Sequence, residues 1–157
     1  MFTLADCFFC YDSAFLKGCV TSVGKNTASY KFALAKSLID ISLERKSDLI
    51  TLDDLALPYA LHLAEHLKHS PKQSTAKTSQ FIQACQGYNE GNIDEDRLIQ
   101  ITKKEGFKYV LDAFHVVNTK AITERFYDVV NEEFFIDERK FNKGIRLTDN
   151  LFNLNST

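Results

Sequence analysis

Three histidines of this chain have the spacing of metal ligands. His62, His66 and His69 are separated by four and then three positions, so on a helix they share a narrow face and two of them could bind a transition metal. A zinc protease helix needs a glutamate directly after the first histidine, and Leu63 stands there. With Glu65 beside them, the pattern favours a solvated helix face, and a metal site or a pH-dependent contact are the alternatives.

The cysteines offer a second candidate chemistry. Cys7 and Cys10 have the C-x-x-C spacing of zinc and redox sites, but the intervening residues are both phenylalanine, and the other two cysteines, Cys19 and Cys85, stand alone. A structural zinc needs a second pair, and a thioredoxin-like site needs a βαβ unit, which this pattern lacks. We therefore predict reduced cysteines buried in the core.

Nucleotide and hydrolase motifs are incomplete. Gly24 and Lys25 precede a helical pattern as in a phosphate-binding loop, but the glycines, Gly18 and Gly24, are six apart and Asn26 follows the lysine. The fingerprint requires a spacing of five and then Ser or Thr. No serine lies in a Gly-x-Ser-x-Gly elbow. The sequence therefore predicts no catalytic residue.

Cations gather around an aromatic residue late in the chain. The run from Arg139 to Arg146 holds four cations and Phe141, and together with Arg125 it could hold phosphates of DNA. The predicted phosphate contacts are Arg125, Arg139, Lys140, Lys143 and Arg146. The alternative is a solvated hairpin tip beside Asp137 and Glu138.

The elements that must position these residues are mainly helical. The clearest helix is predicted over 28–45, where apolar residues cover more than half of the helix circumference and Leu38 is placed in the core. Thr51 resembles an N-cap, with acids in the first turn that follows, and Pro58 predicts a short turn at 52–56 followed by a helix over 57–69. Further helices are predicted at 76–89, at 95–105 with Asp94 as cap, and at 107–117.

The helices at 95–105 and 107–117 resemble a helix-turn-helix in spacing, but the second offers few polar side chains to DNA bases, which favours a structural helix hairpin. β-Branched and aromatic runs predict strands at 125–130, 134–136 and 145–147. The predicted fold is thus mainly α, a compact multi-helix domain with a small β-hairpin or three-stranded element near the C-terminus.

Composition agrees with a globular domain and not with a basic nucleic-acid binder. The chain has 157 residues, 45% of them hydrophobic, and a net charge of -2 spread evenly along its length. No apolar run approaches the roughly 18 residues of a membrane span, and the N-terminus lacks the basic region of a signal peptide. We expect a cytoplasmic protein with no membrane partner.

The last residues predict the start of another element. Gly144 is expected to supply a turn, and Thr148 to cap a helix whose apolar face begins at Leu151 and Phe152. Because the sequence ends about two turns into that helix, we expect a helical module at 1–147 and, at 148–157, a helix that leads to an absent C-terminal domain.

Two stretches carry a resemblance to a known family. They are Asn26 to Leu38, and Arg125-Phe126-Tyr127 followed by Gly144 to Leu151, with Leu111 to His115 between them. The chain resembles the N-terminal helical region of bacterial HNH endonuclease family proteins over almost its whole length. In that family a metal-dependent nuclease domain follows, so the resemblance implies that any divalent metal belongs to the absent domain and that no cofactor is held here.

The resemblance carries over no catalytic residue, because an HNH site needs a His pair or an acid-His pair on a strand. All four histidines of this chain fall on predicted helices. The leading hypothesis is a DNA-engaging or scaffold module of an HNH-type endonuclease, from a restriction or phage-defence system, inactive alone and joined to a nuclease domain or partner protein. The alternative is a stand-alone protein–protein adaptor subunit of a larger complex.

Overall fold

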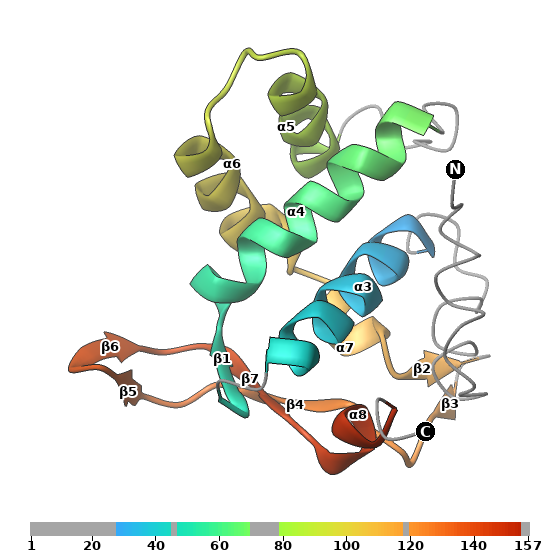
Figure 1. Ribbon diagram of the computed structural model, residues 1–157, viewed down its shortest axis with the longest axis vertical. Helices are drawn as coiled ribbons and strands as arrows, with labels where there is room; N and C mark the ends of the chain where they lie inside the picture. The colour runs from blue at the N-terminus through green and yellow to red at the C-terminus, as the bar shows by residue number, and fades with distance from the viewer. Residues whose placement is uncertain (1–27, 45–46, 70–78, 118–119, 155–157) are drawn as a thin grey trace.

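The computed structural model describes residues 28–44, 47–69, 79–117 and 120–154. Helices form most of this part of the chain, and short antiparallel strands lie near its C-terminal end, as predicted (Figure 1). No described helix has the length and hydrophobicity needed to cross a membrane. The predicted thiol pair at Cys7 and Cys10, Cys19 and the loop at 18–26 lie outside the described residues.

The centre of the molecule is a pair of packed helices, α3 (Ala28–Glu44) and α4 (Leu52–His69). α3 matches the predicted helix, and Leu38 is fully buried, as its position on the wide apolar face predicts. Burying a leucine removes its apolar surface from water and contributes about 1.5–3 kcal/mol. Tyr59 is also fully buried, and its hydroxyl donates a hydrogen bond to the carbonyl of Gly106.

Helix α4 corrects the expectation that Pro58 separates a turn from a helix. The helix begins at Leu52 and continues through Pro58 without a break. Thr51 caps it, because its hydroxyl oxygen accepts the amide of Asp54. Proline removes one hydrogen bond to the carbonyl four residues earlier, which here belongs to the exposed Asp54 near the helix start, where water can replace it.

Two shorter helices cover α4 on one side: α5 (Gln80–Asn89) and α6 (Glu95–Ile101), the latter continuing as a π-helical turn, η2 (Thr102–Gly106). The start predicted at 95 is confirmed, because Asp94 caps α6 by accepting the amide of Arg97. The helix predicted from 76 begins instead at Gln80, with Ser79 as its cap. Gly91 ends α5 with φ of 77°, a conformation that glycine adopts without strain.

The predicted helix at 107–117 is mostly wrong. Only α7 (Val110–Ala113) is helical, and the chain then forms β2 (Val116–Val117), which pairs with β3 (Lys120–Ala121). Two consecutive β-branched valines favour this extended backbone over a continued helix. With four residues in its second helix, the segment forms neither a helix-turn-helix nor a helix hairpin.

A three-stranded antiparallel sheet joins distant parts of the chain. Its order is β1 (Leu49–Thr51), β7 (Gly144–Leu147) and β4 (Tyr127–Val130), and it lies below α3 in Figure 1. The sequence predicted a turn at Gly144, but this residue lies in β7. A Cβ on it would stand 2.5 Å from the carbonyl oxygen of Ile50, so only glycine permits this approach of the two strands.

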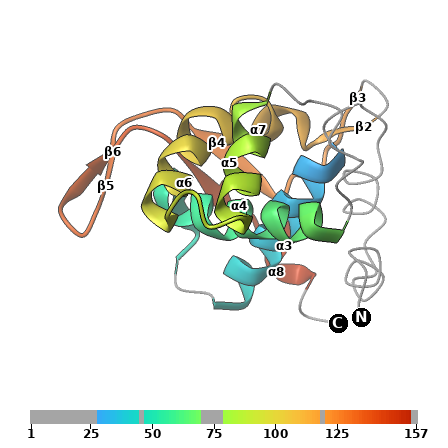
Figure 2. The ribbon, with the colours of Figure 1, turned by 90° about the horizontal axis from the view of Figure 1, so that it is seen from above.

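A two-stranded hairpin projects from the body in both views (Figures 1 and 2). It consists of β5 (Phe134–Ile136) and β6 (Arg139–Phe141), joined by Asp137 and Glu138. These two residues have φ of 50° and 66°, as in a type I′ turn, which costs roughly 1–2 kcal/mol for each residue that is not glycine. The described chain ends with α8 (Asp149–Asn153).

Candidate functional site

The five cations predicted to hold phosphate are accompanied by acids. Arg125 precedes β4, Lys143 lies between β6 and β7, and the other three lie on β6 and β7. Arg125 forms an ion pair with Asp128 at 3.2 Å, and Lys140 one with Glu133 at 2.7 Å. The guanidinium of Arg146 on β7 lies 3.5 Å from the carboxylate of Asp48, 98 positions earlier in the chain. Three of the five positive charges are therefore compensated locally.

The remaining two cations are Arg139 and Lys143. The Arg139 guanidinium lies over the ring of Phe141 at 5.5 Å, in cation–π geometry. Lys143 is exposed and forms no ion pair among the described residues. Over residues 125–147 as a whole, five Lys and Arg are balanced by five Asp and Glu. This segment therefore has no net positive charge, in contrast to the basic patches that are typical of nucleic-acid binders.

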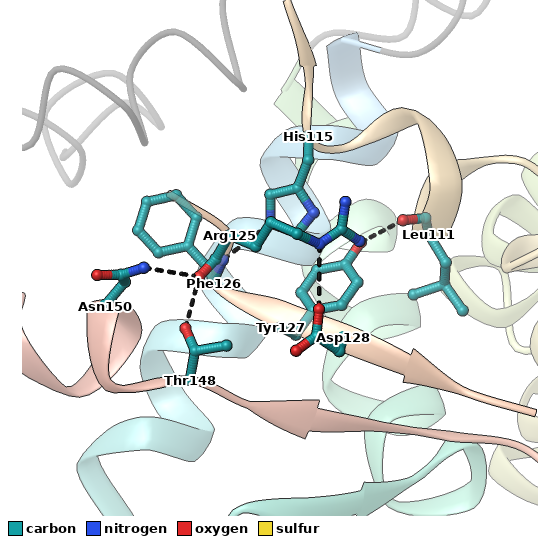
Figure 3. A network of polar contacts seen from close by, with 8 residues as sticks. All are labelled: Leu111, His115, Arg125, Phe126, Tyr127, Asp128, Thr148 and Asn150. Carbon is teal, nitrogen blue, oxygen red and sulfur yellow. Dashed lines mark hydrogen bonds and ion pairs between the residues drawn. The ribbon is translucent and has the colours of Figure 1, made fainter. Parts of the chain in front are cut away.

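Several residues that carry the family resemblance form a hydrogen-bond network, buried at His115 and Tyr127 and shown in Figure 3. The Nε2 atom of His115 accepts the amide of Phe126 at 3.0 Å, and the Tyr127 hydroxyl donates to the carbonyl of Leu111 at 2.7 Å. We call this set, with the two contacts of Arg125 described next, the His115 network. It joins the Leu111–His115 stretch to the Arg125–Tyr127 stretch.

The Gly144–Leu151 stretch, and with it Thr148 and Asn150, joins the same network through the main-chain carbonyl of Arg125. The hydroxyl of Thr148 and the side-chain amide of Asn150 both donate to that carbonyl (Figure 3). Thr148 does occupy the N-cap position of α8, as predicted, but its side chain makes no capping hydrogen bond to the helix. Its role is to connect α8 to the start of β4.

His115 is held in its neutral form. Burial lowers the pKa of its imidazole to about 3, and the charges of Arg125 and Lys31 add to the effect. Because Nε2 accepts a hydrogen bond, the single ring proton resides on Nδ1, which is buried without a hydrogen-bond partner among the described residues. With an exposed fraction of 1%, the imidazole cannot reach a substrate in solution, so the network supports the fold and does not supply catalysis.

The histidines on α4 have protein partners. His62 Nε2 lies 2.6 Å from a carboxylate oxygen of Asp40 on α3, and His69 contacts Glu65 at 3.0 Å. Among the described residues, no group of three or more His, Cys, Asp or Glu is placed to hold a metal ion. Cys85 is buried, and burial raises the pKa of its thiol to about 12, so it is an unreactive core residue, as predicted.

The projecting hairpin presents an apolar side chain that sequence reasoning did not single out. Phe134 and Phe141 stack on each other across the strands with ring centroids 5.7 Å apart. Phe135 lies between Phe134 and Ile136, so its side chain points to the opposite face of the hairpin, and 61% of it is exposed. The aromatic run predicted a strand but could not show which ring remains uncovered.

A cleft of about 610 Å³ lies between the hairpin and the body. The body contributes the end of α3, the strand β1 and the start of α4, and the hairpin contributes its turn. We call it the hairpin cleft; its lining residues are Ile41, Glu44, Ser47, Leu49, Ile50, Asp54, Ile136, Asp137 and Arg139. It combines apolar walls with charged groups.

Comparison of the chain with family models, with curated proteins and with solved structures finds no match. Function must therefore be inferred from the geometry of the molecule.

Proposed function

We propose that this chain is a protein-binding module, inactive as an enzyme by itself, which contacts its partner through the β5–β6 hairpin. The observation that carries the proposal is the exposed Phe135 in the middle of a hairpin that projects from the body (Figure 2). Aromatic side chains supply much of the energy of protein–protein contacts when a partner covers them. The adjacent cleft gives that partner a concave surface to enter.

The charge distribution supports a protein partner over DNA. Ion pairs occupy Arg125, Lys140 and Arg146, and the mixed charges around Phe135 resemble the polar rim of a protein interface. The resemblance to HNH endonuclease family proteins adds a second part to the proposal, in which the bound protein or domain is the nuclease. The engagement of DNA by this chain itself stays a prediction, and the experiment below measures it.

The test places a photo-crosslinking phenylalanine analogue at position 135 of the chain in its native cells. The matched control carries the analogue at Tyr109, which directly precedes α7 and is 71% exposed. We expect one discrete crosslinked protein at position 135 that is missing at position 109. Equal labelling at both positions, or none at position 135, would refute the proposal.

Duplex DNA is then titrated against the purified chain at increasing salt. The comparison variant replaces Arg139, Lys140, Lys143 and Arg146 with alanine. A protein-binding module shows weak binding that the four substitutions leave unchanged. Tight binding that falls steeply with salt and is lost in the variant would instead establish phosphate contacts.

A further inference from the structure

We propose that the hairpin cleft receives an extended segment of the partner protein, in which a lysine or arginine lies next to an apolar residue. This inference rests on the proposed function and names the chemistry of the partner. Three observations support it: the size of the cleft, the edge strand in its wall, and the signs of its charges.

The size of the cleft matches a segment and not a folded surface. Its volume of about 610 Å³ falls in the range of roughly 300–1,000 Å³ that accommodates drug-sized ligands. Ile41, Leu49, Ile50 and Ile136 give it apolar walls from both the body and the hairpin. A cleft of this size takes a few side chains of a peptide, at least one of them apolar.

The conformation of the segment follows from β1. This strand forms one edge of the three-stranded sheet, with β7 as its one neighbour among the described strands, and its residues Leu49 and Ile50 line the cleft. The exposed edge of a sheet can pair with an added strand, which is a common way of binding a peptide. We therefore infer an extended segment.

The charge of the segment follows from the carboxylates of the cleft. Asp54 and Asp137 line it, and the cation among its described lining residues, Arg139, already lies over the Phe141 ring. Asp54 and Asp137 form no ion pair within the described part of the chain. A cation placed between them, beside apolar walls that reduce the access of water, would be attracted more strongly than on an open surface.

The turn of the hairpin offers a matched pair of variants. Asp137 and Glu138 both have positive φ, and asparagine and glycine tolerate that conformation well. Asp137→Asn thus removes a carboxylate of the cleft and keeps the turn. Glu138→Gly relieves the backbone at the same turn and keeps every carboxylate that lines the cleft.

The experiment pans a phage library of random linear 12-residue peptides against the full chain. We expect enriched peptides to share a lysine or arginine beside a branched or aromatic apolar residue. The affinity of a synthetic enriched peptide, measured by fluorescence anisotropy, should fall at least tenfold in the double variant Asp54→Asn, Asp137→Asn. It should be unchanged in Glu138→Gly and in Asp112→Asn, which removes an exposed carboxylate on α7.

Failure of this inference can be distinguished from failure of the proposed function. No enrichment, enriched peptides without a cation, or equal binding by the double variant would overturn the cleft as a receptor for a basic segment. A discrete crosslink at Phe135 in the same protein would then still support a protein-binding hairpin. Peptide binding that follows the predicted pattern supports the cleft whatever the crosslinking shows.

Discussion

The His115 network and the β5–β6 hairpin differ in how strongly their side chains are tied to the rest of the molecule. In the network, buried side chains bond to main-chain groups of other elements, as His115 does with Phe126 and Tyr127 with Leu111. In the hairpin, none of the six strand residues is buried, and the main side-chain contact between the strands is the Phe134–Phe141 stack. The network fixes the fold, whereas the hairpin is free to serve a partner.

This difference also bears on the family resemblance. Its motif residues include Leu111, His115, Arg125 and Thr148, and the structure places them in the network. The motifs therefore describe how α7, β4 and α8 are held together. They include no residue of the hairpin, where we place the function.

The largest effect is expected when one phenylalanine in each region is truncated. Phe126 is 2% exposed and Phe135 is 61% exposed. Phe126→Ala leaves a cavity and should lower the free energy of unfolding by about 3–5 kcal/mol, whereas Phe135→Ala should change it by less than about 0.5 kcal/mol. Urea denaturation measures both values. A large loss in Phe135→Ala would show that the hairpin packs on the body.

A smaller effect is expected from the titration of His115. Its folded pKa, about 3, lies below the ordinary value of 6.5, so between these values the unfolded chain binds more protons and stability falls as pH falls. The loss should reach roughly 2–3 kcal/mol at a pH two units below 6.5.

The control for this prediction is His115→Gln, which keeps an acceptor for the Phe126 amide but does not titrate. Unfolding free energies of both proteins are compared at several pH values from 7 to 4. As pH falls, the unfolding free energy of the natural protein should decrease more than that of the variant. A constant difference would mean that His115 is protonated in the folded protein or accessible to water.

The smallest effect is expected at the hairpin turn. Glu138→Gly removes the strain of a positive φ, but glycine loses more backbone entropy on folding, so the net stabilisation of the hairpin should be about 1 kcal/mol or less. Hydrogen exchange of the β5 and β6 amides should slow, while exchange in α3 and α4 stays the same. Slower exchange across the whole chain would show that the hairpin unfolds together with the body.

The sequence predicted those helices and strands whose own residues favour that structure, without help from distant parts of the chain. The apolar face of α3 and the caps Thr51 and Asp94 were predicted correctly, as were the positions of β4, β5 and β7. The strand β1 was not, because its three residues are extended only by pairing with β7. β6 was likewise missed, because charged Arg139 and Lys140 conceal a strand that main-chain pairing with β5 defines.

The same limit applied to the candidate site. The sequence shows that the five cations lie close together along the chain, but it does not show their ion-pair partners. The partner of Arg146 is Asp48, which no local spacing connects to it. The hairpin cleft is likewise formed from residues of α3, β1, α4 and the turn at Asp137. Its existence depends on the path of the backbone and not on any one motif.

The pairing of β1 with β7 has a consequence for the order of folding. Asp48 and Arg146, which meet beside these strands, are 98 positions apart, whereas α3 and α4 are consecutive helices that pack directly on each other. Because closing a long loop costs entropy before any contact offsets it, we expect the helices to assemble first and the sheet last. During synthesis, the hairpin cleft would then be completed only after β7 has emerged, and pulse-labelled hydrogen exchange during refolding should show β1 protected after α4.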